Sequence, residues 1–131
     1  MKALAAVVAF FGLAVMLSAQ EQKEQRLTVK VVVPDLAWTI SIEEVYQLGK
    51  ELVVVSEVSR KEGATAIIED TAISAAVTVT APVLPVKRIV LGNPTYAKRK
   101  EPYEFLKNRK ELGTRLDSAK LIYKREKKAG Q

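Results

Sequence analysis

The sequence predicts a mainly β protein, a small antiparallel sandwich or barrel, followed by a C-terminal amphipathic basic helix. Two observations carry the β prediction: apolar and polar residues alternate at strand spacing, and several short β-branched segments follow one another with turn residues between them. The third observation is a change in charge. Residues 20–86 hold ten acidic and six basic side chains, whereas residues 87–131 hold fourteen basic and five acidic ones. Such a change predicts two parts with different roles.

Residues 1–19 have the order of a secretory signal peptide. Lys2 precedes an uncharged apolar run over residues 3–17, and Ser18 and the small Ala19 precede a polar stretch. The run is shorter than the roughly 20 residues that a membrane-spanning helix needs. A buried N-terminal helix or an uncleaved anchor are the alternatives. We expect cleavage after Ala19 and a mature protein that is exported to the periplasm or the extracellular space.

The next part, residues 20–95, is predicted to form the β domain. In residues 27–33 every odd position is apolar, and Trp38, Ile40 and Ile42 alternate with polar neighbours, so that Trp38 is expected in the core. The β-branched run 52–58 is long enough to be buried on both faces. Further strand material lies at residues 65–68, 75–80 and 87–91, with turns at 34–35, 48–50, 61–63 and 92–94.

The last part, residues 96–131, is predicted to form the basic helix. Pro102 suits a first helical turn, and Gly113 would bend or split the helix. Apolar residues recur near one helical stripe. They are Leu106, Leu112, Leu116, Ala119 and Ile122 or Tyr123.

Composition excludes several kinds of chemistry. The chain contains neither histidine nor cysteine, so it cannot form Ser-His-Asp or Cys-His catalytic sites, His- or Cys-based metal sites, or disulfides. Two acidic pairs exist, Glu43-Glu44 and Glu69-Asp70, but neighbours in a regular strand point to opposite faces and would not converge on one bond. We therefore expect no catalytic residues, no metal, no cofactor and no enzymatic activity.

Two basic clusters are the candidate binding residues. They are Lys98, Arg99 and Lys100, and Lys124, Arg125, Lys127 and Lys128. Such clusters attract anionic lipid or polymer, at about 1 kcal/mol per basic residue near an anionic membrane. Aromatic residues lie between them, as in nucleic-acid binders, but export argues against nucleic acid as a partner. The alternative is a solvated helix face without a ligand.

Residues 38–93 resemble a family of exported bacterial β domains, typified by the C-terminal domain of the PrcB-type protein that stabilises a secreted protease complex. The segments that carry the resemblance are Trp38-Thr39-Ile40-Ser41-Ile42, Val45-Tyr46, residues 49–55, residues 76–79 and Leu84-Pro85-Val86. The chain lacks the aromatic-proline pair usual in the later strand of that family, and it adds the basic C-terminal part. The resemblance implies a binding or stabilising module.

These observations predict a non-enzymatic module that binds another exported or envelope protein. The alternative function is binding of anionic lipid or polymer, for example at a membrane surface, through the basic C-terminal part.

The signal-peptide prediction is tested by the intact mass of the protein recovered from the producing cell's exported fraction. The mass should correspond to a chain that starts at Gln20 or within a residue or two of it, because the small residue Ala19 ends the apolar run. A full-length form that is extracted only with membranes would contradict cleavage.

Overall fold

Seven strands and one short 3-10 helix make up the part of the chain that the computed structural model describes, which comprises residues 21–61, 63, 68–92 and 102–126. The strands are β1 (Gln22–Asp35), β2 (Trp38–Leu48), β3 (Glu51–Arg60), β4 (Ile68–Pro82), β5 (Val86–Leu91), β6 (Glu104–Leu106) and β7 (Lys120–Lys124), and the 3-10 helix is η1 (Arg109–Leu112). The prediction of a mainly β protein is confirmed.

The strands form two sheets. β1 and β4 pair antiparallel along their whole length, from Gln22 opposite Pro82 to Asp35 opposite Ile68. The other sheet has the order β6-β5-β3-β2-β7, in which β2 is antiparallel to β3 and β7, whereas β3–β5 and β5–β6 are parallel pairs. The expected purely antiparallel arrangement is therefore wrong for this sheet. The chain leaves it after β3, forms β4 in the other sheet and returns beside β3 in the same direction, which is the crossover that a parallel pair requires.

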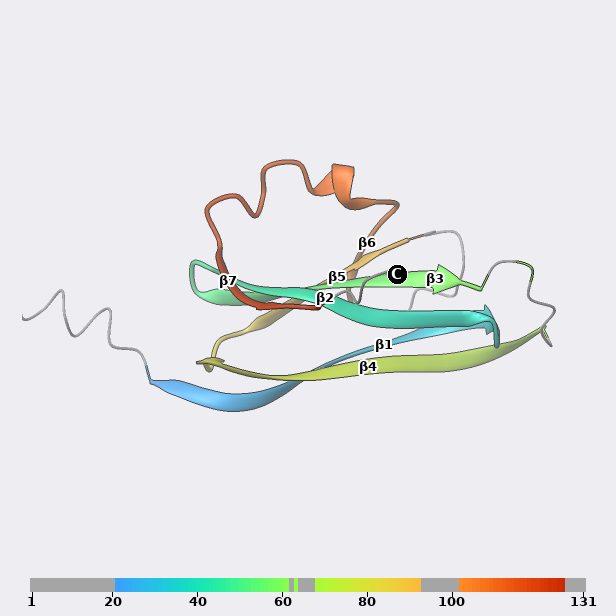
Figure 1. Ribbon diagram of the computed structural model, residues 1–131, viewed down its shortest axis with the longest axis horizontal. Helices are drawn as coiled ribbons and strands as arrows, with labels where there is room; N and C mark the ends of the chain where they lie inside the picture. Colours follow the sequence, from blue (N-terminus) through green and yellow to red (C-terminus); the bar gives the residue numbers. More distant parts are fainter. Residues whose placement is uncertain (1–20, 62, 64–67, 93–101, 127–131) are drawn as a thin grey trace, which may run out of the picture.

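The first core lies between the two sheets, where Figure 1 shows β1 and β4 beneath β2, β3 and β5. The odd positions of β1 from Leu27 to Val33 are buried there, which confirms the predicted alternation. Trp38 and Ile40 are half-buried against the same cluster. We call this cluster the inner core. Its buried members are Leu27, Val29, Val31, Val33, Ile42, Val45, Leu52, Val54, Val58, Val79, Ala81 and Val90.

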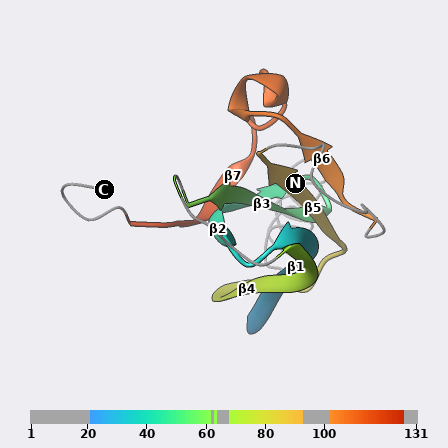
Figure 2. The same cartoon turned by 90° about the vertical axis from the view of Figure 1, so that its right-hand side faces the viewer.

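A second core lies on the opposite face of the five-stranded sheet. We call it the outer core, and its buried members are Val53, Val55, Ile89, Leu91 and Leu112. The segment between β6 and β7 arches over this face and contributes Leu112, with Leu106 and Leu116 beside it (Figures 1 and 2). Since β3 supplies residues to both cores, the prediction that this run is buried on both faces is confirmed.

The predicted C-terminal helix is wrong. Residues 102–126 contain β6, η1 and β7 but no α-helix, and residues 96–101 and 127–131 lie outside the described residues. The apolar residues of the supposed stripe serve two separate layers: Leu112 and Leu116 pack on the outer core, whereas Ile122 and Tyr123 pack on the inner core. One straight helix could not reach both sides of a sheet, and pairing of β7 with β2 places them there instead.

Turn chemistry shapes the segment over the outer core. The Asn108 side chain accepts a hydrogen bond from the Lys110 N–H (3.0 Å), and Gly113 ends η1 with a φ of 57°. Arg115 then binds Glu104 of β6 with two hydrogen bonds of 2.6 and 2.7 Å. Hydrogen bonding from Arg115 lowers the pKa of Glu104 to about 2, so this bidentate link persists at all but strongly acidic pH.

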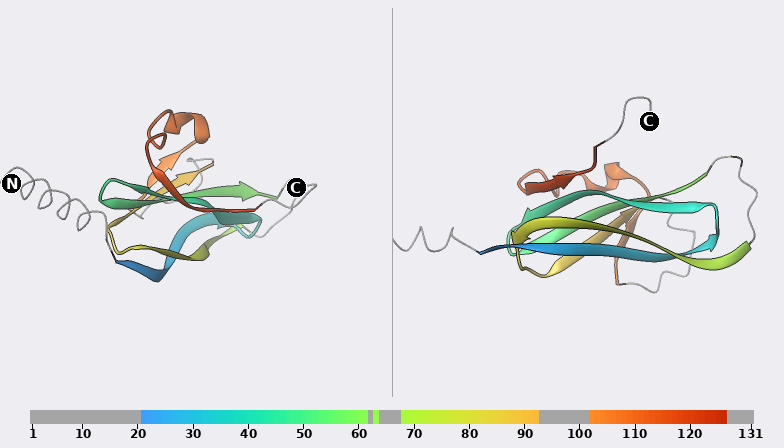
Figure 3. Two further views of the ribbon diagram at one scale, coloured as in Figure 1. Left: turned by 60° about the vertical axis from the view of Figure 1, so that its left-hand side comes forward. Right: turned by 60° about the horizontal axis from the view of Figure 1, so that its bottom comes forward.

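Residues 1–20 are outside the described residues, and the signal-peptide prediction with them. Among the described residues, no helix has the length and apolar character that crossing a membrane requires. Figure 3 shows how the two sheets and the arching segment stack in two further views.

The close approach of Gly92, at the end of β5, to the paired strand β3 is tested by two matched glycine substitutions. Gly92 follows β5 with a φ of 138°, and a Cβ there would overlap Val58 Cγ2 and lie 2.8 Å from the Val58 carbonyl oxygen. Gly49, in the β2–β3 turn, has a φ of 61° and open space around it. We expect Gly49→Ala to lower the free energy of unfolding by about 1 kcal/mol, through backbone strain alone.

Gly92→Ala should cost roughly 2–4 kcal/mol, because overpacking adds to the strain. Equilibrium urea unfolding measures both. Equal losses for the two variants would contradict the close approach of Gly92 to β3.

Candidate functional site

A break in the regular pairing of β2 positions the candidate site. Ile42 pairs with Ser56 and Glu44 with Val55, so Glu43 is the extra residue of a β-bulge. A bulge interrupts the alternation of side chains along a strand. Ile42 and Val45, three residues apart, both reach the inner core for this reason. The expectation that Glu43 and Glu44 point to opposite faces is wrong at this bulge, since both line one pocket, where each is held by a different arginine.

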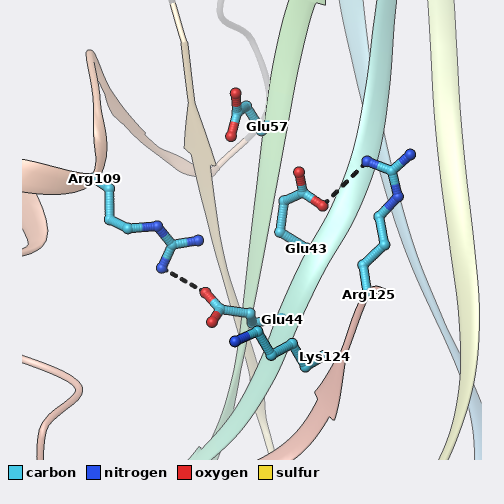
Figure 4. A pocket seen from close by; sticks show the side chains of 6 residues that line it. All are labelled: Glu43, Glu44, Glu57, Arg109, Lys124 and Arg125. Atoms are coloured by element: carbon cyan, nitrogen blue, oxygen red, sulfur yellow. Dashed lines mark hydrogen bonds and ion pairs between the residues drawn. The ribbon is translucent and has the colours of Figure 1, made fainter. Parts of the chain in front are cut away.

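This mixed-charge pocket has a volume of about 340 Å³ and carries three acidic and three basic side chains. It lies over the bulge of β2, between η1 and the end of β7 (Figure 4). The lining residues are Glu43 and Glu44 from β2, Glu57 from β3, Arg109 from η1, Lys124 from β7 and Arg125 directly after it. Residues far apart in the sequence therefore meet here because β2 pairs with both β3 and β7.

Glu44 is the most tightly held acidic group of the pocket. Its Oε2 accepts a hydrogen bond from the Tyr46 hydroxyl (2.8 Å), and its Oε1 lies 2.5 Å from Nη1 of Arg109. The Glu44 side chain is 12% exposed and that of Arg109 is 53% exposed, so a solvated cation compensates a buried anion. Burial, and then the hydrogen bond to Glu44, raise the pKa of Tyr46. Burial disfavours the charge of Arg109, but the hydrogen bond and charge of Glu44, together with Tyr46 and Glu57, outweigh burial and raise the pKa of Arg109.

Glu43 has its own cationic partner. Its carboxylate lies 3.4 Å from Arg125 Nη1, and its carbonyl oxygen accepts a 2.8 Å hydrogen bond from the Arg125 backbone N–H. The Glu43 side chain is 11% exposed and that of Arg125 is 43% exposed. The pocket thus has a buried acidic floor and a solvated cationic rim. Two exposed charged groups, Glu57 and Lys124, lie outside this floor and make no hydrogen bond or ion pair with the other described residues.

The predicted basic clusters are only partly within the described residues. Lys124 and Arg125 line the mixed-charge pocket, where they face carboxylates. Lys98, Arg99, Lys100, Lys127 and Lys128 lie outside the described residues. The expected cation-rich face is thus, at Lys124 and Arg125, a site of balanced charge.

Sequence reasoning missed Glu43, Glu44, Glu57 and Arg109 as members of one site. A signal for the bulge does exist: the apolar phase of Ile40 and Ile42 resumes at Val45, three positions later, with two polar residues between. That spacing is typical of one inserted residue in a strand. No local pattern connects Arg109 or Glu57 to this bulge.

Comparison of the chain with protein families, curated proteins and solved structures finds no match. Within the part of the chain that the structure describes, no three acidic side chains are arranged to hold a metal ion. The mixed-charge pocket carries three acidic and three basic side chains, and charges arranged in this way suit contact with charged groups.

The pairing at the pocket floor is tested by a double-mutant cycle. Arg109→Met leaves the buried Glu44 carboxylate without its cation and should lower the free energy of unfolding by roughly 1–2 kcal/mol. Adding Glu44→Gln should recover at least half of this loss, because the amide needs no counter-charge and can still bond to Tyr46.

Lys110→Met is the control, since Lys110 is exposed in the same 3-10 helix and lies outside the pocket. It should change stability by less than about 0.5 kcal/mol. Additive effects of the Arg109 and Glu44 substitutions in urea unfolding would show that the ion pair contributes nothing.

Proposed function

We propose that the mature chain is an exported, non-enzymatic module that stabilises a protein complex by accepting an extended segment of another exported or envelope protein. The docking position is the free edge of β7. The observation that carries the proposal is the place of β7 at the end of the five-stranded sheet: among the described strands it pairs only with β2, and its Leu121 is 48% exposed.

The backbone of β7 is oriented for addition of a strand. The Arg125 N–H donates to the Glu43 carbonyl and so points toward β2. In an antiparallel strand the backbone N–H groups of successive residues point alternately toward one edge and the other. The Lys124 N–H therefore points away from β2, to the open edge of β7. An added strand would satisfy such groups with main-chain hydrogen bonds, while Leu121 offers an apolar contact.

Charge favours a different protein over a second copy of this chain. Lys120 and Lys124 lie near the two ends of β7, and Arg125 follows. Antiparallel pairing of two β7 strands would bring Lys120 opposite Lys124, and like charges in opposed positions destabilise a strand pair. The edge therefore favours a segment that carries acidic residues. The resemblance to the PrcB-type domain implies the same class of function and stays a prediction.

Binding of anionic lipid or polymer is the weaker candidate. Of the seven basic residues that suggested it, Lys124 and Arg125 are within the described residues, and both face the carboxylates of the mixed-charge pocket. The nearby acidic groups reduce the attraction of these cations for an anionic surface.

The proposal is tested with synthetic eight-residue peptides and fluorescence anisotropy. A peptide of alternating valine and glutamate should bind the mature protein at low ionic strength, whereas the valine–lysine counterpart should bind at least roughly tenfold more weakly, a difference of about 1.4 kcal/mol. Leu121→Asp should weaken binding of the acidic peptide to a similar degree, because it removes the apolar contact and adds repulsion.

The matched control is Val83→Asp, since Val83 is 67% exposed in the connection between β4 and β5 and is not part of the β7 edge. It should leave the affinity unchanged. Equal binding of the two peptides, or equal effects of the two substitutions, would exclude the β7 edge as the docking position.

A further inference from the structure

The mixed-charge pocket has two charged groups left over after its internal pairs are counted. Glu43 is paired with Arg125 and Glu44 with Arg109, whereas the exposed Glu57 and Lys124 make no ion pair with the other described residues. The charge of Glu57 acts on Arg109 from a longer range and helps to raise the pKa of that guanidinium. Glu57 belongs to β3 and Lys124 to β7, the two strands that flank β2. Figure 4 draws Glu57 at the top of the pocket and Lys124 at the bottom, with one ion pair to either side.

From this arrangement we propose that the pocket binds a small zwitterion, a compound that carries one ammonium and one carboxylate group, such as a free amino acid or a short peptide. The ligand ammonium binds the Glu57 carboxylate, and the ligand carboxylate binds the Lys124 ammonium.

The balance of charge selects a zwitterion over a simple ion. The lining has three acidic and three basic groups, so a ligand of one sign gains little from the pocket as a whole. A lone cation could pair with Glu57 and a lone anion with Lys124, but each would leave the other group without a partner. A zwitterion pairs with the Glu57 carboxylate and the Lys124 ammonium at the same time. Such complementarity of charge gives specificity for zwitterions over ions of one sign.

The pocket is prepared for such a ligand without rearrangement. The floor carboxylates are held by their arginines, so no internal ion pair has to break when a ligand enters. Lys124 is opposite Glu44, which is opposite Val55, so Glu57 lies two residues further along β3 than the position level with Lys124. Two strand spacings and this offset put the two backbones roughly 12 Å apart, and the long side chains of Glu57 and Lys124 shorten the gap between their charges. A peptide extends by roughly 3.5 Å per residue, so a ligand of one to three residues covers the possible spans.

This inference shares Lys124 with the proposed docking at β7 but rests on a different observation, the lining of the mixed-charge pocket. A zwitterion meets the Lys124 side chain within the pocket, whereas an added strand meets the main chain at the free edge. The variant Leu121→Asp should therefore retain zwitterion binding, and the two proposals can fail separately.

The test is a titration of the isotope-labelled mature protein followed by two-dimensional NMR. The probes are glycine, glycylglycine and triglycine, compared with N-acetylglycine, which lacks the ammonium, and glycinamide, which lacks the carboxylate. At least one of the three zwitterions should cause saturable shifts of the amides at Ile42, Glu44, Glu57 and Lys124, with a millimolar Kd. Both singly charged probes should bind at least tenfold more weakly.

Substitutions within the pocket complete the test. Glu57→Gln and Lys124→Met should each weaken zwitterion binding at least tenfold. The controls Glu51→Gln and Lys120→Met change the same residue types at the other ends of β3 and β7, outside the pocket, and should have no effect. The proposal is overturned if no zwitterion saturates, if a singly charged probe binds equally well, or if the controls weaken binding as much as the pocket variants.

Discussion

Burial of β3 on both faces is the constraint on which the rest of the structure depends. The five consecutive residues 52–56 are each at most 2% exposed, and their side chains alternate between the two faces of the sheet. A run of this kind requires an apolar layer on each side of its sheet. The β1–β4 ribbon supplies one layer, and the segment around Leu112 supplies the other. The C-terminal part of the chain is thus an integral layer of the β structure.

The same constraint positions the mixed-charge pocket. The segment that covers the outer core carries Arg109 to the carboxylate of Glu44, and the return of the chain as β7 brings Lys124 and Arg125 to the other side. The bulge at Glu43 then turns two neighbouring carboxylates into the same pocket. Because the carboxylates of Glu43 and Glu44 are buried and each is held by a solvated arginine, their charges lie at defined places. A site with this organisation can distinguish ligands by the arrangement of their charges as well as by their net charge.

The failure of the helix prediction has a physical cause. The spacing of Leu106, Leu112, Leu116 and Ile122 is compatible with a helical stripe. Periodicity indicates which residues are buried, but it does not indicate the surface against which each one packs. Residues 107–119 also contain turn formers, and one short 3-10 turn begins after Asn108 and ends at Gly113. Pairing of β7 with the otherwise open edge of β2 adds long-range hydrogen bonds that a solvated helix would not have. Contacts with the two faces of the five-stranded sheet and pairing with β2 therefore outweighed the local preference for a helix.

The sequence by itself determined strands such as β1 and β3, because the period-two alternation of β1 and the doubly apolar, β-branched run of β3 are local patterns typical of strands. It also determined the turn at Gly49, where the chain needs a positive φ. The parallel pairing of β5 with β3, the conversion of the C-terminal part into strands, and the meeting of Glu44, Glu57, Arg109 and Lys124 were decided only by the tertiary structure. Each of these depends on contacts between segments separated by tens of residues. No local pattern encodes such contacts, since they form only when the two faces of β3 are covered.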